Sequence, residues 1–127
     1  MILGLSPGDQ VARVERLRLS GDMPLAIERA ALSAATLPDP ASVGSSLYSH
    51  LEKTGNRPVR AIQRIRAANL DEDDARLLEI PPGAAALHIE RVAYLPSGKV
   101  VELTRSVYRG DTYDFVAELR VGDAARK

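Results

Sequence analysis

The chain has 127 residues with 17 basic and 17 acidic side chains, and this charge balance argues against a basic nucleic-acid-binding domain or a polybasic membrane patch. The absence of cysteine excludes a disulfide scaffold and a thiolate metal site, and it fits a reducing compartment. No apolar run is long enough for a signal peptide or a membrane span. We therefore expect one soluble cytoplasmic domain with a core of Val, Ile, Leu and Ala.

The first expected element is a β-hairpin. Side chains that alternate in polarity predict a strand over 11–19. Ser20-Gly21-Asp22 predicts the turn, and a second strand is expected from Pro24. Residues 81–92 repeat the Pro-Gly turn, alternating run and Glu-Arg-aliphatic triplet of residues 6–17, so a similar hairpin is expected near the end of the chain.

A loop and a short helix follow the first hairpin. The loop is expected over 38–44, and Ser45 or Ser46 then caps a helix that continues to Lys53. Gly55 supplies the C-terminal stop.

A strand and a second helix are expected next. Residues 58–68 predict the strand, and Asn69 or Asp71 opens a helix over 72–78. Acidic residues fill its first turn, where they favour the helix dipole, and Pro81-Pro82 ends it.

The predicted order is strand, strand, helix, strand, helix, strand, strand, strand. The final strand is expected where Tyr113 and Phe115 resume the pattern after a break at Gly110-Asp111. This order predicts an α+β domain with the helices on one face of a single antiparallel sheet built from two related halves.

The segment 100–108 carries one polar side. Alternation places Glu102, Thr104, Ser106 and Tyr108 together, opposite a mostly apolar side. Such a polar side faces either water or a ligand, and solvent is the simpler interpretation for this segment alone.

Residues of the first expected strand and of the first expected helix suit an anionic ligand. Arg16 and Arg18 share one face of the first strand, where two guanidinium groups can clamp a phosphate or a carboxylate, although a solvated basic edge has the same pattern. Ser46 at a helix start can offer donors to an anion, but an ordinary serine cap explains it equally well. Tyr48 can instead pack inside the domain.

Two acids interrupt apolar runs. Glu28 and Glu102 can accept hydrogen bonds from sugar hydroxyls or an amide, or act as a catalytic acid and base. Alternatively, these two carboxylates form ion pairs across the strands with Arg16, Arg18 or Arg105.

Other chemistry has weak support. His50 and His88 are the only histidines and lack metal-ligand spacing, and residues 71–74 are better explained as a helix start than as a cation site. No phosphate-binding glycine loop, nucleophile elbow or catalytic triad is present.

Several segments together resemble the effector-binding (UTRA) domain of the HutC subfamily of GntR-type bacterial transcription regulators. They are Arg16-Leu17-Arg18, Pro24-Leu25-Ala26-Ile27-Glu28, Ser46-Leu47-Tyr48, Ile89-Glu90-Arg91-Val92 and Tyr108-Arg109-Gly110-Asp111. The resemblance covers nearly the whole chain. It implies a chorismate-lyase-like fold, an antiparallel sheet with flanking helices, and a small-molecule sensor with no cofactor and no enzymatic activity.

The resemblance also implies a ligand and the residues that hold it. The ligand would be a small anionic metabolite, most plausibly a phosphorylated sugar or amino sugar, although dicarboxylates, phosphonate-related compounds and amino-acid breakdown products also suit arginine clamps. Phosphate contacts would come from Arg16, Arg18, Ser46 and Tyr48, and sugar contacts from Glu28, Glu102 and Tyr108.

Regulators of this kind are homodimers that carry a winged helix-turn-helix DNA-binding domain, which residues 1–127 lack. We therefore expect this chain to be the effector-binding domain alone, beginning inside its usual first segment, with DNA bound only through the missing domain. A chorismate-lyase-like enzyme using Glu28 and Glu102 is one alternative. A pure dimerisation domain is another, but it leaves the polar strand faces unexplained.

Overall fold

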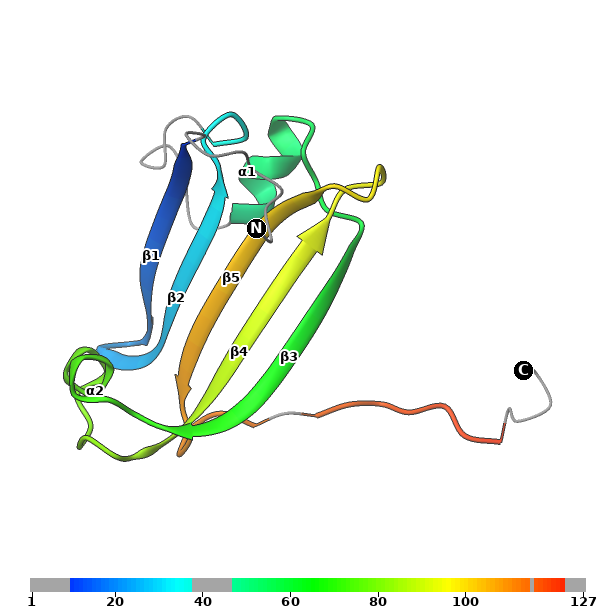
Figure 1. Cartoon of the computed structure of the whole chain (residues 1–127). Helices are drawn as coiled ribbons and strands as arrows, with labels where there is room; N and C mark the ends of the chain where they lie inside the picture. Colours follow the sequence, from blue (N-terminus) through cyan, green and yellow to red (C-terminus); the bar gives the residue numbers. More distant parts are fainter. Residues whose placement is uncertain (1–9, 38–46, 115, 123–127) are drawn as a thin grey trace.

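The computed structural model describes residues 10–37, 47–114 and 116–122, without the side chain of Tyr48. The described elements are β1 (Val11–Ser20), β2 (Met23–Ser33), α1 (Leu47–Lys53), β3 (Arg60–Asn69), α2 (Glu72–Leu78), β4 (Ala85–Tyr94) and β5 (Val100–Arg109). The strands form one antiparallel sheet in the order β1-β2-β5-β4-β3 (Figure 1). The predicted α+β class is confirmed.

The two predicted hairpins supply four of the five strands of this sheet. β1 pairs with β2 and β4 pairs with β5, and the two hairpins join because β2 and β5 also pair with each other. The internal repeat therefore corresponds to two hairpins that meet through their second strands. β3 extends the sheet beyond β4 and forms one of its two edges.

Both helices are short, and the predicted signals at Asp71 and Gly55 are confirmed, whereas the predicted caps Ser45 and Ser46 of α1 lie outside the described residues. The backbone N–H of Asp74 donates to the Asp71 carboxylate at 2.8 Å, so Asp71 and not Asn69 caps α2. Glu79 ends this helix in the left-handed conformation. Gly55 follows α1 with φ 77°, a value that glycine adopts without strain.

The two faces of the sheet are distinguished by the strand register, because residues directly opposite each other share a face. We call the face that bears Arg16, Glu28 and Ser106 the first face, since these residues lie opposite one another in β1, β2 and β5. The second face bears Arg29 and Arg105, which pair in the neighbouring row.

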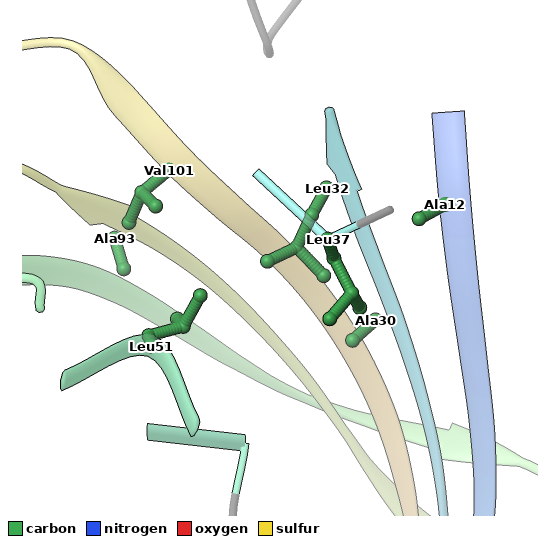
Figure 2. Close-up of a cluster of buried hydrophobic side chains, with 7 residues drawn as sticks. All are labelled: Ala12, Ala30, Leu32, Leu37, Leu51, Ala93 and Val101. Carbon is green, nitrogen blue, oxygen red and sulfur yellow. The ribbon is translucent and has the colours of Figure 1, made fainter. Parts of the chain in front are cut away.

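Each helix covers a different face, near opposite ends of the sheet (Figure 1). α1 packs on the first face through a cluster that Figure 2 shows, which consists of Ala12, Ala30, Leu32, Leu37, Leu51, Ala93 and Val101. α2 packs on the second face, where Ala75 and Leu78 join Ile27 and Val107. The expectation that both helices lie on one face is therefore wrong.

The predicted strand after Gly110-Asp111 is also wrong. β5 ends at Arg109 as expected, but residues 113–114 and 116–121 adopt no regular secondary structure, and Phe115 lies outside the described residues. The expected loop over 38–44 lies outside them as well.

Candidate functional site

Four of the predicted site residues meet on the first face of the sheet. Arg16 lies opposite Glu28, and in the next row Arg18 and Tyr108 lie on either side of Ala26. Three strands that are distant in sequence therefore bring two guanidinium groups, a carboxylate and a phenol together.

Arg18 and Glu28 already form an ion pair in this arrangement. The Nε of Arg18 donates to the Oε1 of Glu28 at 2.5 Å, and the two side chains are 47% and 19% exposed. The cross-strand pairing that the sequence left open for Glu28 is thus present. Without another anion, this carboxylate serves as the counterion of Arg18.

Glu102 lies on the same face and is fully buried. The register between β4 and β5 shifts near Ala93, and Val101 is the extra residue of this β-bulge. The Thr104 hydroxyl donates a hydrogen bond to Glu102, and the Nε of Arg91 lies 3.7 Å from its Oε1. A buried carboxylate needs such partners to remain in a folded domain.

The polar side of β5 does not face water. Glu102, Thr104 and Ser106 are all buried, and Tyr108 is half-buried. The solvent interpretation of this side is therefore wrong. On the opposite side of the same strand Arg105 is exposed, whereas Val107 is buried against α2.

Arg91 is a site residue that the sequence analysis did not single out. It lies opposite Thr104 on the first face, one row from Arg16 and Glu28. A signal was present in the repeat, because Glu90-Arg91-Val92 matches Glu15-Arg16-Leu17 and both arginines project from the same face. The site therefore contains three arginines.

Tyr108 is held as a neutral phenol. Burial raises its pKa, and the nearby Glu28 carboxylate and Tyr113 raise it further, while Arg18 and Arg91 act in the opposite direction. Its ring lies 4.6 Å from that of Tyr113 between centroids. The phenol therefore keeps its proton and can donate it in a hydrogen bond to a ligand.

The remaining residues of the Tyr108-Arg109-Gly110-Asp111 segment have structural roles. Arg109 donates to both carboxylate oxygens of Asp111, at 2.7 and 3.0 Å, and to the carbonyl of Pro24 at 3.1 Å. A Cβ on Gly110 would lie 2.7 Å from the carbonyl oxygen of Ala85. These contacts fix the end of β5 and so the position of Tyr108.

Two predicted residues cannot be placed. Ser46 lies outside the described residues, and nothing is described of the Tyr48 side chain beyond its position in the first turn of α1. Their predicted phosphate contacts stay predictions.

The described part of the chain offers neither a metal-binding cluster nor a membrane-spanning helix. No group of three or more His, Cys, Asp and Glu side chains there could hold a metal ion. None of the helices there is long and apolar enough to cross a membrane.

Comparison with known proteins identifies the family. Residues 1–114 match the family model described as the UTRA domain. The chain belongs to the UTRA domain family. This UTRA domain is 36% identical over 118 residues to the HTH-type transcriptional repressor NagR of Bacillus subtilis, covering 91% of the chain and 49% of the relative. It is 29% identical over 116 residues to the mannosyl-D-glycerate transport/metabolism system repressor MngR of Escherichia coli, covering 89% and 48%.

Solved structures agree with this assignment. The UTRA domain superimposes with a TM-score of 0.85 and 30% identity on a GntR-family transcriptional regulator from Enterococcus faecalis, covering 93% of this chain and 87% of that one. The effector domain of PhnF from Mycobacterium smegmatis gives a TM-score of 0.88 with 27% identity, covering 94% and 76%. The chain spans about half the length of the curated relatives it matches. A regulatory role for the family, rather than an enzymatic one, is supported by these relatives.

Proposed function

We propose that this domain binds a small anionic metabolite on the first face of the sheet, and that a phosphorylated sugar or amino sugar fits this face best. The observation that carries the proposal is the gathering of Arg16 and Arg18 with Glu28 and Tyr108 in two adjacent rows, beside the buried Glu102. Such a ligand has an anionic end and a hydroxyl-rich end, and the face offers groups for both.

The anionic end belongs with the arginines. Arg16 and Arg18 project from one strand toward the same side, a geometry suited to a phosphate. Ser46 and Tyr48 are proposed as further phosphate contacts.

The hydroxyl-rich end belongs with the acceptors and the phenol. Glu28 and Glu102 accept hydrogen bonds and Tyr108 donates one, a combination that sugar hydroxyls can satisfy because each is both donor and acceptor. MngR, one of the relatives, is named for a system that handles a sugar derivative, mannosyl-D-glycerate, and this supports a sugar-related ligand.

Ligand binding exchanges partners within the site. A phosphate near β1 competes with Glu28 for Arg18, and the released carboxylate becomes available to a sugar hydroxyl. The phosphate and the sugar hydroxyls are then recognised together, because the phosphate contact to Arg18 frees the Glu28 carboxylate to accept a hydrogen bond from a hydroxyl.

In a longer protein, we propose that residues 1–127 are the effector-binding domain of a homodimeric transcription regulator and that the ligand changes how a separate helix-turn-helix domain binds DNA. The relatives named as HTH-type transcriptional repressors support this role. The differential affinity of the ligand for the two states would set the size of the effect.

The first test is a thermal-shift screen with glucose 6-phosphate, glucosamine 6-phosphate, the two unphosphorylated sugars, dicarboxylates and imidazole acids. A ligand that binds only the folded state raises the Tm. A shift with the phosphorylated sugars alone supports the proposal, and a shift with dicarboxylates alone contradicts the proposed ligand class.

The residue-level test is Arg18→Ala. We expect the ligand Kd from calorimetry to rise on the order of 10- to 100-fold, because a charge-assisted hydrogen bond contributes about 1.5–3 kcal/mol. Arg13→Ala is the matched control, since Arg13 is an exposed arginine of β1 on the second face, opposite Ala31. An unchanged Kd in Arg18→Ala removes Arg18 from the site.

The enzyme alternative is separated from sensing by the fate of the ligand. The two acids it would use are held by hydrogen-bond donors, Glu28 by Arg18 and Glu102 by Thr104. We expect NMR to show the bound sugar phosphate unchanged after prolonged incubation. Turnover of that ligand, or of chorismate, would favour the enzyme.

A further inference from the structure

A second Arg-aliphatic-Arg pattern occurs in the chain, and the proposed function does not use it. Arg64-Ile65-Arg66 in β3 has the same pattern as Arg16-Leu17-Arg18 in β1. The two strands are the opposite edges of the sheet. Their arginines lie on opposite faces, since Arg64 shares a row with Glu90 and Arg105 on the second face. Each outer strand therefore carries a pair of guanidinium groups on one side.

The arginine pair of β3 borders a hollow on the second face. The hollow has a volume of about 340 Å³, and its polar lining consists of Arg64, Arg66, His88, Glu90 and Arg105. These residues come from β3, β4 and β5, so three neighbouring strands build the hollow. Its volume lies within the range of small-ligand pockets, about 300–1,000 Å³.

Positive charge dominates this hollow. Three guanidinium groups accompany a single carboxylate, and the Nε of Arg105 already donates to the Oε2 of Glu90 at 3.1 Å. The side chains of Arg64 and Arg66 form no hydrogen bond or ion pair within residues 10–37, 47–114 and 116–122. Two neighbouring like charges repel each other, and an anion between them removes this repulsion.

The neighbouring glutamate distinguishes the two arginine pairs. On the first face, Glu28 pairs with Arg18 and so supplies the counterion. On the second face, Glu90 lies opposite Arg64 but pairs with Arg105 on its other side. The arginine pair of β3 is thus left without a counterion among the described residues, and an external anion has no carboxylate to displace there.

We propose that this hollow is a second anion site, separate from the first face, and that it binds a phosphate group. Arg64 and Arg66 can converge on one phosphate, because Cα atoms two residues apart on a strand are about 6.6 Å apart and both side chains project from the same face. His88 lies opposite Arg66 and offers a ring N–H as a further donor. Phosphate suits such a set because its oxygens accept from several donors at once.

The charges around the hollow favour the phosphate of a small molecule over a nucleic-acid backbone. A backbone needs a positive surface that extends over several phosphates. Next to the hollow, Arg29 is already held by two carboxylates, those of Glu15 and Asp74. The positive area is therefore limited to one group. Inorganic phosphate and the phosphate of a monoester share this chemistry.

An NMR titration of the whole chain with inorganic phosphate, at constant ionic strength, tests the site. We expect saturable chemical-shift changes at the Nε–H groups of Arg64 and Arg66 and at the ring of His88. The same titration with methyl phosphate distinguishes a monoester from free phosphate as the source, and saturation with either compound supports the site.

Three results of this titration would overturn the proposal. The first is the absence of saturable changes with both phosphate compounds. The second is an equal response to sodium chloride, which would show that any anion screens these charges. The third is a response to a short DNA duplex without a response to either phosphate compound, which would indicate a nucleic-acid contact instead.

The double variant Arg64→Gln with Arg66→Gln identifies the donors. Both side chains are exposed in β3, so we expect this variant to fold as the parent does. The Kd for inorganic phosphate should rise at least about tenfold, because two charge-assisted hydrogen bonds are lost. The matched control is Arg13→Gln with Arg76→Gln, which removes the same charge from exposed arginines outside the hollow. An unchanged Kd in the first variant, or an equal rise in the control, contradicts the assignment.

The position of the affected signals keeps this site apart from the proposed sugar-phosphate site. Binding on the first face would change the signals of Arg18 and Tyr108, whereas binding in the hollow changes those of Arg64, Arg66 and His88. Changes on the first face alone would support the proposed function and overturn the second site. Changes in the hollow alone would support the second site, and the sugar-phosphate proposal would then be decided by its own thermal-shift screen.

Discussion

Arg18 and Glu28, two residues of the proposed binding site, form an ion pair with each other. Their ion pair spans β1 and β2 on the first face, and both side chains keep some exposure to solvent. A solvent-exposed pair contributes at most about 1 kcal/mol to stability. An entering anion can therefore take over Arg18 at small cost, which suits a site that must bind reversibly.

Glu102 is held more firmly, and its removal should affect stability. Glu102→Ala removes the acceptor of the Thr104 hydroxyl and the carboxylate beside Arg91. We expect the free energy of unfolding to fall by about 3 kcal/mol, the lower end for a broken buried pair because Arg91 is 37% exposed. Urea unfolding followed by circular dichroism measures this loss. Glu90→Ala is the control, since its partner Arg105 is 63% exposed, and we expect about 1 kcal/mol or less. Equal losses in both variants would contradict the role assigned to Glu102.

Tyr108 predicts a pH dependence at alkaline pH. Its pKa is raised above 10.0 in the folded domain, first by burial and then by Glu28, so the folded state keeps the phenol proton after the unfolded chain has lost it. The contribution of this pKa difference to the free energy of unfolding is fully present below the pKa of Tyr108 in the unfolded chain. It is lost as the pH rises through the pKa of Tyr108 in the folded domain.

The difference between the parent chain and Tyr108→Phe isolates this effect. We expect the free energy of unfolding to decrease less steeply above pH 10 in Tyr108→Phe than in the parent, because the variant has no phenol at this position. Tyr94→Phe, at the far end of β4, serves as the control. Parallel curves for parent and Tyr108→Phe would contradict the prediction.

The residues of the site were predictable to the extent that strand alternation determines their face. Alternation correctly placed Arg16 with Arg18, and Thr104 with Ser106, on common faces. It did not show that the second pair is buried, because burial depends on what packs above the sheet. Arg91 was missed although the internal repeat matches it to Arg16, because Arg91 has no second arginine two residues away on its own strand.

Elements with local end signals were predictable in both position and type. Asp71 and Gly55 mark helix ends that the structure reproduces, since caps act through neighbouring backbone groups. The predicted strand after β5 failed for a non-local reason. β5 already pairs with β2 and β4, so the chain that follows has no free edge beside it. Which face each helix covers also depends on long-range packing.

The turn after β5 should not tolerate a larger residue than glycine. Gly110→Ala would place its Cβ 2.7 Å from the Ala85 carbonyl oxygen, and the backbone there must shift. We expect the free energy of unfolding to fall by about 1–3 kcal/mol, which is typical of overpacking. Thermal denaturation measures it, with Thr112→Ala in the same exposed turn as a control that should change little. A Tm equal to that of the parent would show that the strand end accommodates the methyl group.

At the scale of the whole molecule, each face of the sheet combines an apolar cluster under one helix with charged residues beside it. The first face packs against α1 and also bears Arg16, Arg18, Arg91, Glu28, Glu102 and Tyr108. The second face packs against α2 and also bears Arg29 and Arg105. The zero net charge of the chain says nothing of this arrangement, since composition does not report where charges lie.

The pairing of β2 with β5 has a consequence for synthesis of the chain in a cell. Each hairpin joins neighbouring segments and can form early, but Ala26 meets Tyr108 only after most of the chain has been made. On a ribosome, the arginines of β1 therefore emerge long before the strand that completes their site. A nascent chain arrested before residue 108 would carry the arginine hairpin without the strand that completes the proposed site.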